Sequence, residues 1–215
     1  ANDAEKRKQR TASISNLIAT GQGKSPACWY VNSQGQTMVV IPGPISFQMG
    51  SPRTERDRED REVSHQRRIN RTFAISAKFV TLEQYRSLAD NQFNIGEKYN
   101  RFPDLPVTGL NWFMAARYCN LLSKAEHIPE DQWCYEINGN ETKLRKNYLS
   151  LTGYRLPSEA EMEYATRAGA VTSRFFGETE ALLGNYAWYL KNANDLLQRT
   201  GLKKPNDFGL FDMQG

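Results

Sequence analysis

The sequence predicts an α+β domain with short strands, few helices and long irregular loops. Three observations lead to this fold class. Apolar residues alternate over stretches of only about five residues, which is typical of short strands. Capping residues mark a small number of separate helices, without a regular alternation of helix and strand. Beyond residue 168 the chain is rich in glycine, asparagine and aromatic residues and shows little periodicity. This combination fits an α+β architecture better than a doubly wound parallel sheet.

Four strands are predicted in the first half of the domain and its middle. Residues 37–41 and 45–49 are predicted to pair as a hairpin around Pro42-Gly43-Pro44, because proline and glycine favour a chain reversal. Residues 68–79 form the next alternating stretch, and residues 134–137 form a later strand that ends at a turn. The expected core residues of the 68–79 strand are Ile69, Phe73 and Ile75.

Three helices are predicted from their first residues. Thr81 is a good N-cap, and Gln84 three residues later completes a capping box. Asn111 begins a second helix, whose apolar face includes Cys119. A third helix begins at Ser158, with Glu161 closing another capping box.

The 215 residues are enough for one domain with a substantial core. We divide them into a connector, residues 1–27, and the domain proper, residues 28–215. Within the connector, Ile14, Leu17 and Ile18 have the spacing of a short amphipathic helix. No apolar run approaches the roughly 20 residues of a membrane span. We therefore expect a cytoplasmic protein without a membrane partner.

The net charge of +4 does not indicate nucleic-acid binding. The most charged stretch, residues 53–62, alternates in sign almost residue by residue, which is typical of a solvated loop. The three cysteines, Cys28, Cys119 and Cys134, include no CxxC pair. This pattern argues against a disulfide framework and against a zinc site.

Glu159 and Glu163 are like charges one helical turn apart and need a compensating cation, for which Arg155 or Arg167 is available. Paired carboxylates serve acid–base catalysis in many enzymes. We favour a structural charge network here.

Five segments occur in a fixed order between residues 38 and 215. They are Met38–Gly43 with Phe47–Ser51, Val80–Tyr85, Pro106-Val107 with Asn111–Cys119, Arg155–Ala165, and Pro205–Gly215. Together they resemble the formylglycine-generating enzyme family, also called sulfatase-modifying factor domains. The resemblance implies a C-type-lectin-like α+β fold. Residues 29–37 further resemble a subgroup in bacterial planctomycete-type proteins, in which this domain often follows a protein-kinase region. We therefore expect fusion to further domains.

Family members use two cysteines near the C-terminus to bind copper(I) and oxidise a cysteine of a sulfatase-type peptide to Cα-formylglycine. The present chain stops at Gly215, within a family segment that precedes those cysteines. We therefore expect a chain that is incomplete at its C-terminus and marginally stable, and we name no catalytic residue. Copper is expected only if the cysteines follow. The alternative is a non-catalytic module that binds a ligand or protein partner within a larger, kinase-linked signalling protein.

The resemblance also implies structural calcium. One site would use Asp212, the carbonyl of Gly215 and groups just beyond it, since calcium takes side-chain and carbonyl oxygens from irregular loops; we therefore expect this site to be incomplete in the present chain. A second would begin at Asn185 and Tyr186. Its remaining ligands fall where the sequence diverges, with Asn194 and Asp195 as stand-ins. Ordinary turn chemistry is the alternative explanation of Asn185 and Asp195.

Overall fold

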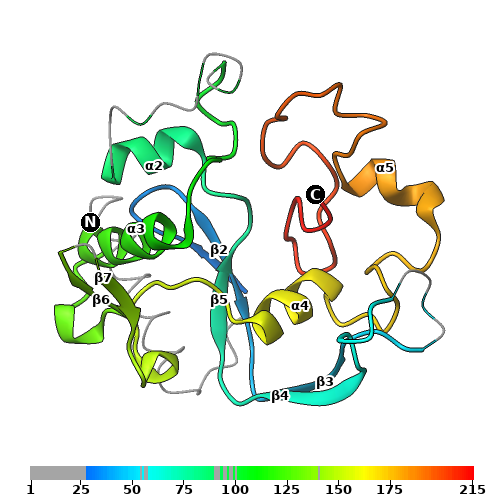
Figure 1. Cartoon of the computed structure of the whole chain (residues 1–215), viewed down its shortest axis with the longest axis horizontal. Helices are drawn as coiled ribbons and strands as arrows, with labels where there is room; N and C mark the ends of the chain where they lie inside the picture. The colour runs from blue at the N-terminus through cyan, green and yellow to red at the C-terminus, as the bar shows by residue number, and fades with distance from the viewer. Residues whose placement is uncertain are drawn as a thin grey trace.

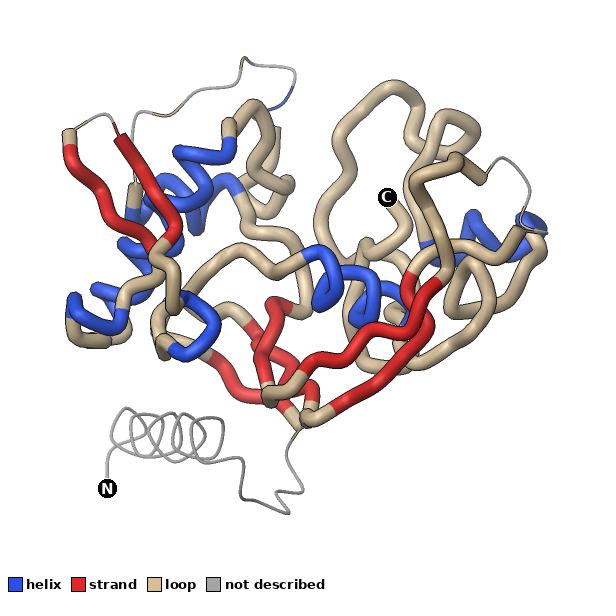
Figure 2. The backbone as a smooth tube through the Cα atoms, turned by 60° about the horizontal axis from the view of Figure 1, so that its bottom comes forward, coloured by secondary structure: helices blue, strands red, loops and turns tan. Residues whose placement is uncertain are grey.

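The structure is a computed structural model that describes residues 28–53, 55, 58–89, 93, 96, 99, 101–139 and 141–215. The connector and its predicted amphipathic helix lie outside the described residues. The predicted fold class is confirmed, because short strands and few helices are joined by long loops (Figure 1, Figure 2). Among the described residues, no helix has the length and apolar character needed to cross a bilayer.

The described strands form three small antiparallel sheets. One contains three strands in the order β1-β2-β5, and the other two are the pairs β3-β4 and β6-β7. The strands are β1 (Trp29–Val31), β2 (Thr37–Ile41), β3 (Ile45–Met49), β4 (His65–Ile69), β5 (Phe73–Ser76), β6 (Tyr135–Asn138) and β7 (Glu141–Leu144).

The predicted hairpin of residues 37–49 is wrong in its pairing, although both strands exist. β2 pairs with β5, and β3 pairs with β4. Residues 42–44 turn a corner beside residues 70–72, and a Cβ on Gly43 would lie 2.1 Å from the carbonyl oxygen of Arg71. β2 and β3 thus form one continuous bent segment, and β4 and β5 form another that bends beside it. The chain reverses in the charged loop between β3 and β4. The same corner splits the predicted 68–79 strand into β4 and β5.

The predicted helix starts are confirmed. Thr81 and Ser158 form capping boxes with Gln84 and Glu161, and the Asn111 side chain accepts from the backbone N–H of Met114. The helices they begin are α2 (Leu82–Leu88), α3 (Trp112–Ala125) and α4 (Glu159–Arg167); a short α5 (Leu183–Tyr186) follows. Single 3₁₀ turns cover Glu130–Gln132, Tyr148–Ser150 and Glu180–Leu182.

The main core joins the bent strands to α4 and to the C-terminal loop. Its buried members include Ile41, Ile69, Phe73, Ala165 and Leu210. Two of the three expected core residues, Ile69 and Phe73, are thus buried, whereas Ile75 is only partly covered. The core places the C-terminal loop directly on the sheet and α4.

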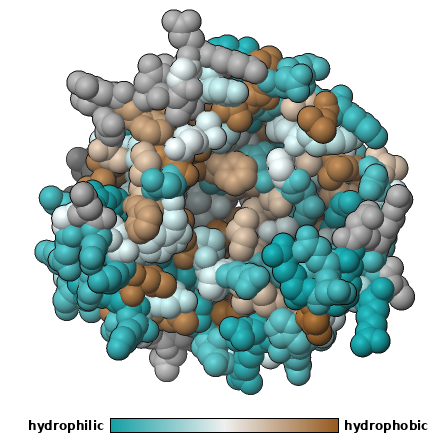
Figure 3. Space-filling view, viewed as in Figure 1, coloured by the Kyte–Doolittle hydropathy of each residue, from teal (hydrophilic) through white to brown (hydrophobic). Residues whose placement is uncertain are grey.

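Residues 187–215 form loops on one side of the molecule, and α2, α3 and the β6-β7 hairpin lie on the other (Figure 1). The loops are attached to the strands by the N–H of Phe211, which donates to the carbonyl of Ala77 at 2.8 Å. The surface is hollowed near the centre of this face, where apolar residues are exposed (Figure 3). The C-terminal loop borders the centre of the molecule.

Candidate functional site

Asn206 holds the C-terminal loop in place. Its buried side chain accepts from the N–H groups of Phe208 and Leu210 at 3.0 and 3.1 Å. It also donates to the carbonyl of Ala165 in α4 at 2.7 Å. An asparagine that satisfies the loop backbone on one side and a helix on the other fixes the turn without regular secondary structure.

Asp212 has one carboxylate oxygen without a partner. The residue is 5% exposed and has a left-handed backbone, with φ of 58°. Oδ2 accepts from the N–H of Gly201 at 2.7 Å. Oδ1 is buried, and no described residue donates a hydrogen bond to it. Burial raises the pKa of this carboxyl group, although the Gly201 N–H and the Lys78 charge oppose the shift. The free oxygen therefore suits a cation or a proton.

Gly215 lies in the same turn as Asp212. Its N–H donates to the carbonyl of Asp212 at 3.4 Å, and its own carbonyl accepts from the N–H of Trp188 at 2.9 Å. The structure thus brings together the two residues predicted for the first calcium site. Calcium favours carboxylate and carbonyl oxygens in irregular loops, so the unpartnered Oδ1 of Asp212 fits that ion. The described residues contain no group of three or more His, Cys, Asp or Glu side chains placed to hold a metal.

The second predicted calcium site has a different environment. The side chain of Asn185 is exposed, and its carbonyl accepts from the N–H of Lys204 at 2.9 Å. The Lys203 ammonium donates to the carbonyl of Gly184 at 2.7 Å and lies 3.8 Å from the centroid of the Trp188 ring. The Lys203 ammonium therefore already places a positive charge beside Asn185, which would repel a calcium ion. These residues do not fit the predicted second calcium site.

The other residues of that second set fulfil structural roles. The ring of Tyr186 stacks on Phe176 with centroids 4.7 Å apart. Asn194 and Asp195 are exposed and have left-handed backbones, with φ of 54° and 52°. Among the described residues, no hydrogen bond joins Asn194 or Asp195 to Asn185. Their conformation matches the turn chemistry considered above.

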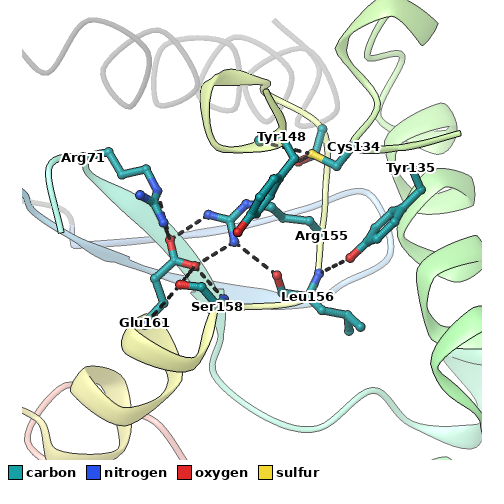
Figure 4. Close-up of polar contacts among 9 residues, drawn as sticks. Arg71, Cys134, Tyr135, Tyr148, Arg155, Leu156, Ser158 and Glu161 are labelled. Atoms are coloured by element: carbon teal, nitrogen blue, oxygen red, sulfur yellow. Dashed lines mark hydrogen bonds and ion pairs between the residues drawn. The ribbon is translucent and has the colours of Figure 1, made fainter. Parts of the chain in front are cut away.

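Glu161 is the centre of a buried charge network that the sequence did not single out as such (Figure 4). Arg155 donates to both of its carboxylate oxygens, at 2.7 and 2.6 Å, and Arg71 donates to Oε1 at 2.6 Å. Burial alone would raise the pKa of Glu161, but the hydrogen bonds and charge of Arg155, together with Ser158, lower it to about 2. A carboxylate held this strongly in its charged form does not act as a proton shuttle near neutral pH.

The charge compensation expected for Glu163 is present. Its carboxylate lies 3.0 Å from the Arg167 guanidinium and accepts from the N–H of Gly50 at 2.8 Å. Arg155 compensates Glu161 instead of Glu159. The structural interpretation of these carboxylates is therefore supported.

The described cysteines do not form a reactive pair. Cys119 and Cys134 are buried, and Cys28 is exposed. Burial raises the pKa of the Cys119 thiol to about 12. It also raises the pKa of Cys134, despite the lowering effects of Arg155 and Arg145. Copper(I) binds thiolates, so these two buried thiols do not fit a copper site. The burial of Cys119 agrees with its predicted place on the apolar face of α3.

The fold and the C-terminal turn define an α+β domain of the C-type-lectin-like, formylglycine-generating-enzyme class. Residues 30–215 match the sulfatase-modifying factor enzyme 1-like domain. The chain therefore belongs to this family.

Two solved structures share the fold. Treponema denticola variable protein 1 is 26% identical, with a TM-score of 0.62 over 82% of this chain and 68% of that chain. PvdO from Pseudomonas aeruginosa is 23% identical, with a TM-score of 0.66 over 89% and 72% of the two chains. A curated relative, the chaperone protein LppX of Paenibacillus barcinonensis, is 27% identical over 136 residues, which cover 51% of this chain. The match spans 49% of that relative, or about half its length.

Proposed function

We propose that this chain forms a calcium-stabilised domain of a formylglycine-generating-type protein, which oxidises a cysteine of a sulfatase-type peptide. The observation that carries the proposal is the buried Oδ1 of Asp212, to which no described residue donates a hydrogen bond, in the family segment that includes residues 205–215. Membership of the family over residues 30–215 supports the reaction class.

The residues of this chain have a positioning role in the proposal. Asn206 and Gly201 hold the turn, so that the Asp212 carboxylate is fixed before an ion binds. A calcium ion at Oδ1 would neutralise the charge whose burial raises the pKa of Asp212. A fixed turn would in turn provide a rigid border for a bound peptide.

The oxidation requires groups other than the buried cysteines. When bound by two thiolates, copper(I) would supply the activation of oxygen. Cys119 and Cys134 are buried with raised thiol pKa values, so we assign them to the core. The reactive thiols would come from other residues of the complete protein.

The test of the reaction uses the complete protein loaded with copper(I), oxygen and a peptide that contains Cys-x-Pro-x-Arg. Oxygen uptake is recorded, and the product aldehyde is captured with a hydrazide and identified by mass spectrometry. The proposal predicts uptake that depends on both copper and the peptide cysteine. Absence of aldehyde with a copper-loaded, folded protein would refute the oxidase assignment.

The second candidate is a non-catalytic module that binds a polypeptide within a larger, kinase-linked protein. It is favoured by the lack of a reactive thiol pair among the described residues. The relative LppX is named a chaperone protein, which is compatible with polypeptide binding. Calorimetry with the same peptide, carrying serine in place of cysteine, separates the candidates. Binding of both peptides without aldehyde formation would favour the module.

A further inference from the structure

A surface cavity of about 370 Å³ lies between the β3-β4 hairpin and the C-terminal end of α4. Its aromatic part consists of Phe47 and Tyr164, whose ring centroids are 5.1 Å apart. Ser46 and Gln48 from β3 line one side, and Val171, which is 85% exposed, lines another. The volume is in the range of sites that accept a small ligand or a few side chains. None of its lining residues belongs to the Asp212 turn.

The backbone of β3 is open toward this cavity. Within the described chain, β3 pairs only with β4. Immediately after β3, the N–H of Gly50 donates to Glu163 and its carbonyl accepts from Arg167, both in α4. The next N–H, that of Ser51, donates to Glu62 on the β4 side. The α4 side is therefore the edge of β3 opposite its partner strand.

The direction of the remaining β3 amides follows from strand geometry. Backbone N–H groups two residues apart point to the same side of an extended strand. Since the N–H of Gly50 points toward α4, the N–H groups of Gln48 and Ser46 point there as well. The carbonyls of these two residues point the same way. The cavity is thus bordered by an alternating row of backbone donors and acceptors.

We propose that the free edge of β3 binds an extended polypeptide segment as an added strand, with one neutral apolar side chain in the cavity. Only another backbone matches alternating donors and acceptors at strand spacing, and edge pockets then select side chains. The charge of the cavity wall is already neutralised, because Arg167 is paired with Glu163 at 3.0 Å. Phe47 and Tyr164 therefore favour an aromatic or branched apolar side chain over a charged one.

The length of the added strand is set by α4. Glu163 and Arg167 already occupy the backbone groups of Gly50, so the ladder ends before that residue. The available edge is β3 itself, the five residues Ile45–Met49. This site depends on neither Asp212 nor a cysteine, so it goes beyond the proposed function and is compatible with both candidates. Its test omits calcium and copper.

The test uses the complete chain and a panel of fluorescent, end-blocked pentapeptides, Thr-Val-X-Val-Thr, in which X is Phe, Leu, Ala or Asp. We expect the Phe or Leu peptide to bind, and the Ala and Asp peptides to bind at least about tenfold more weakly. Methylation of one alternate set of peptide amides should abolish binding, and methylation of the other set should leave it within about twofold. Equal sensitivity of both sets, or no binding by any peptide at about 1 mM, would overturn the proposal.

Substitutions in β3 locate the site. Ser46→Pro removes the outward N–H and should weaken binding at least about tenfold, whereas Ser46→Ala keeps the backbone and should bind normally. If Ser46→Pro does not fold, Ala170→Trp, at the cavity wall, should block the apolar side chain while leaving β3 intact. In the unsubstituted protein, the bound peptide should slow amide hydrogen exchange at Ser46 and Gln48. Unchanged exchange at both amides would also overturn the proposal.

Discussion

Arg155 and Glu161 form a buried, two-pronged ion pair, with N–O distances of 2.7 and 2.6 Å. The Glu161 side chain is 1% exposed and also accepts from Arg71. Arg155 precedes α4, Glu161 lies in its first turn, and Arg71 lies at the corner between β4 and β5. The pair therefore fixes the start of α4 on the bent strands, and through α4 it supports the loop that carries Asp212.

Replacement of Glu161 should strongly destabilise the fold. Glu161→Gln leaves Arg155 and Arg71 without their shared carboxylate, which costs about 3–5 kcal/mol in buried pairs. Urea unfolding followed by circular dichroism measures the free energy of unfolding. Glu159→Gln, an exposed position in the same turn, is the matched control and should change it by less than about 0.5 kcal/mol. Equal effects of the two substitutions would contradict the assigned role.

The same pair predicts an acid-dependent loss of stability. The pKa of Glu161 is about 2 in the folded protein, below its ordinary value of 4.5. Its charged form therefore stabilises the fold above about pH 4.5, and this contribution of about 3 kcal/mol is lost as the pH falls toward 2. Unfolding free energies between pH 6 and pH 2.5 should fall less steeply in Glu161→Gln. An identical slope in both proteins would contradict the lowered pKa.

Asn206 should be essential for the C-terminal loop. Asn206→Ala removes two bonds to the loop backbone and two to α4, and we expect a loss of about 2–3 kcal/mol in unfolding free energy. Amide exchange should accelerate at Phe208 and Leu210. Asn147→Ala is the control, because Asn147 is exposed, has a φ of −97° and makes no side-chain capping hydrogen bond; it should leave both quantities unchanged.

Thiol reactivity tests the assignment of the buried cysteines. Native protein treated with Ellman's reagent at pH 8 should react rapidly only at Cys28, the exposed cysteine. Cys119 and Cys134 should react after denaturation, because burial raises the pKa of each thiol. Rapid modification of Cys119 in the native state would contradict its place in the core.

Local sequence signals predicted the helix starts well. The capping boxes at Thr81 and Ser158 depend on residues three positions apart, so they are visible in the sequence. The strand pairing was predicted wrongly, because Pro42-Gly43-Pro44 fits both a reversal and a corner. The close approach of Gly43 to Arg71, 28 residues later, decides in favour of the corner.

The candidate site was predicted in part. The resemblance identified Asp212 and Gly215, and the structure places them in one turn. The Lys203 ammonium beside Asn185 was not anticipated, because its contact with Gly184 joins residues 19 positions apart. The two-arginine environment of Glu161 likewise depends on Arg71, 90 residues earlier. Such contacts arise from tertiary structure and leave no periodic signal in the chain.

The most direct test of the proposed domain is calorimetric titration of calcium into the complete protein. We predict one site that is lost, or weakened at least about tenfold, in Asp212→Asn and retained in Asp207→Asn, an exposed position in the same loop. Protons compete for the Asp212 carboxylate, whose pKa is raised, so calcium affinity should fall as the pH is lowered. Equal calcium affinity in Asp212→Asn and the unsubstituted protein, or no binding to either, would contradict the calcium-stabilised turn.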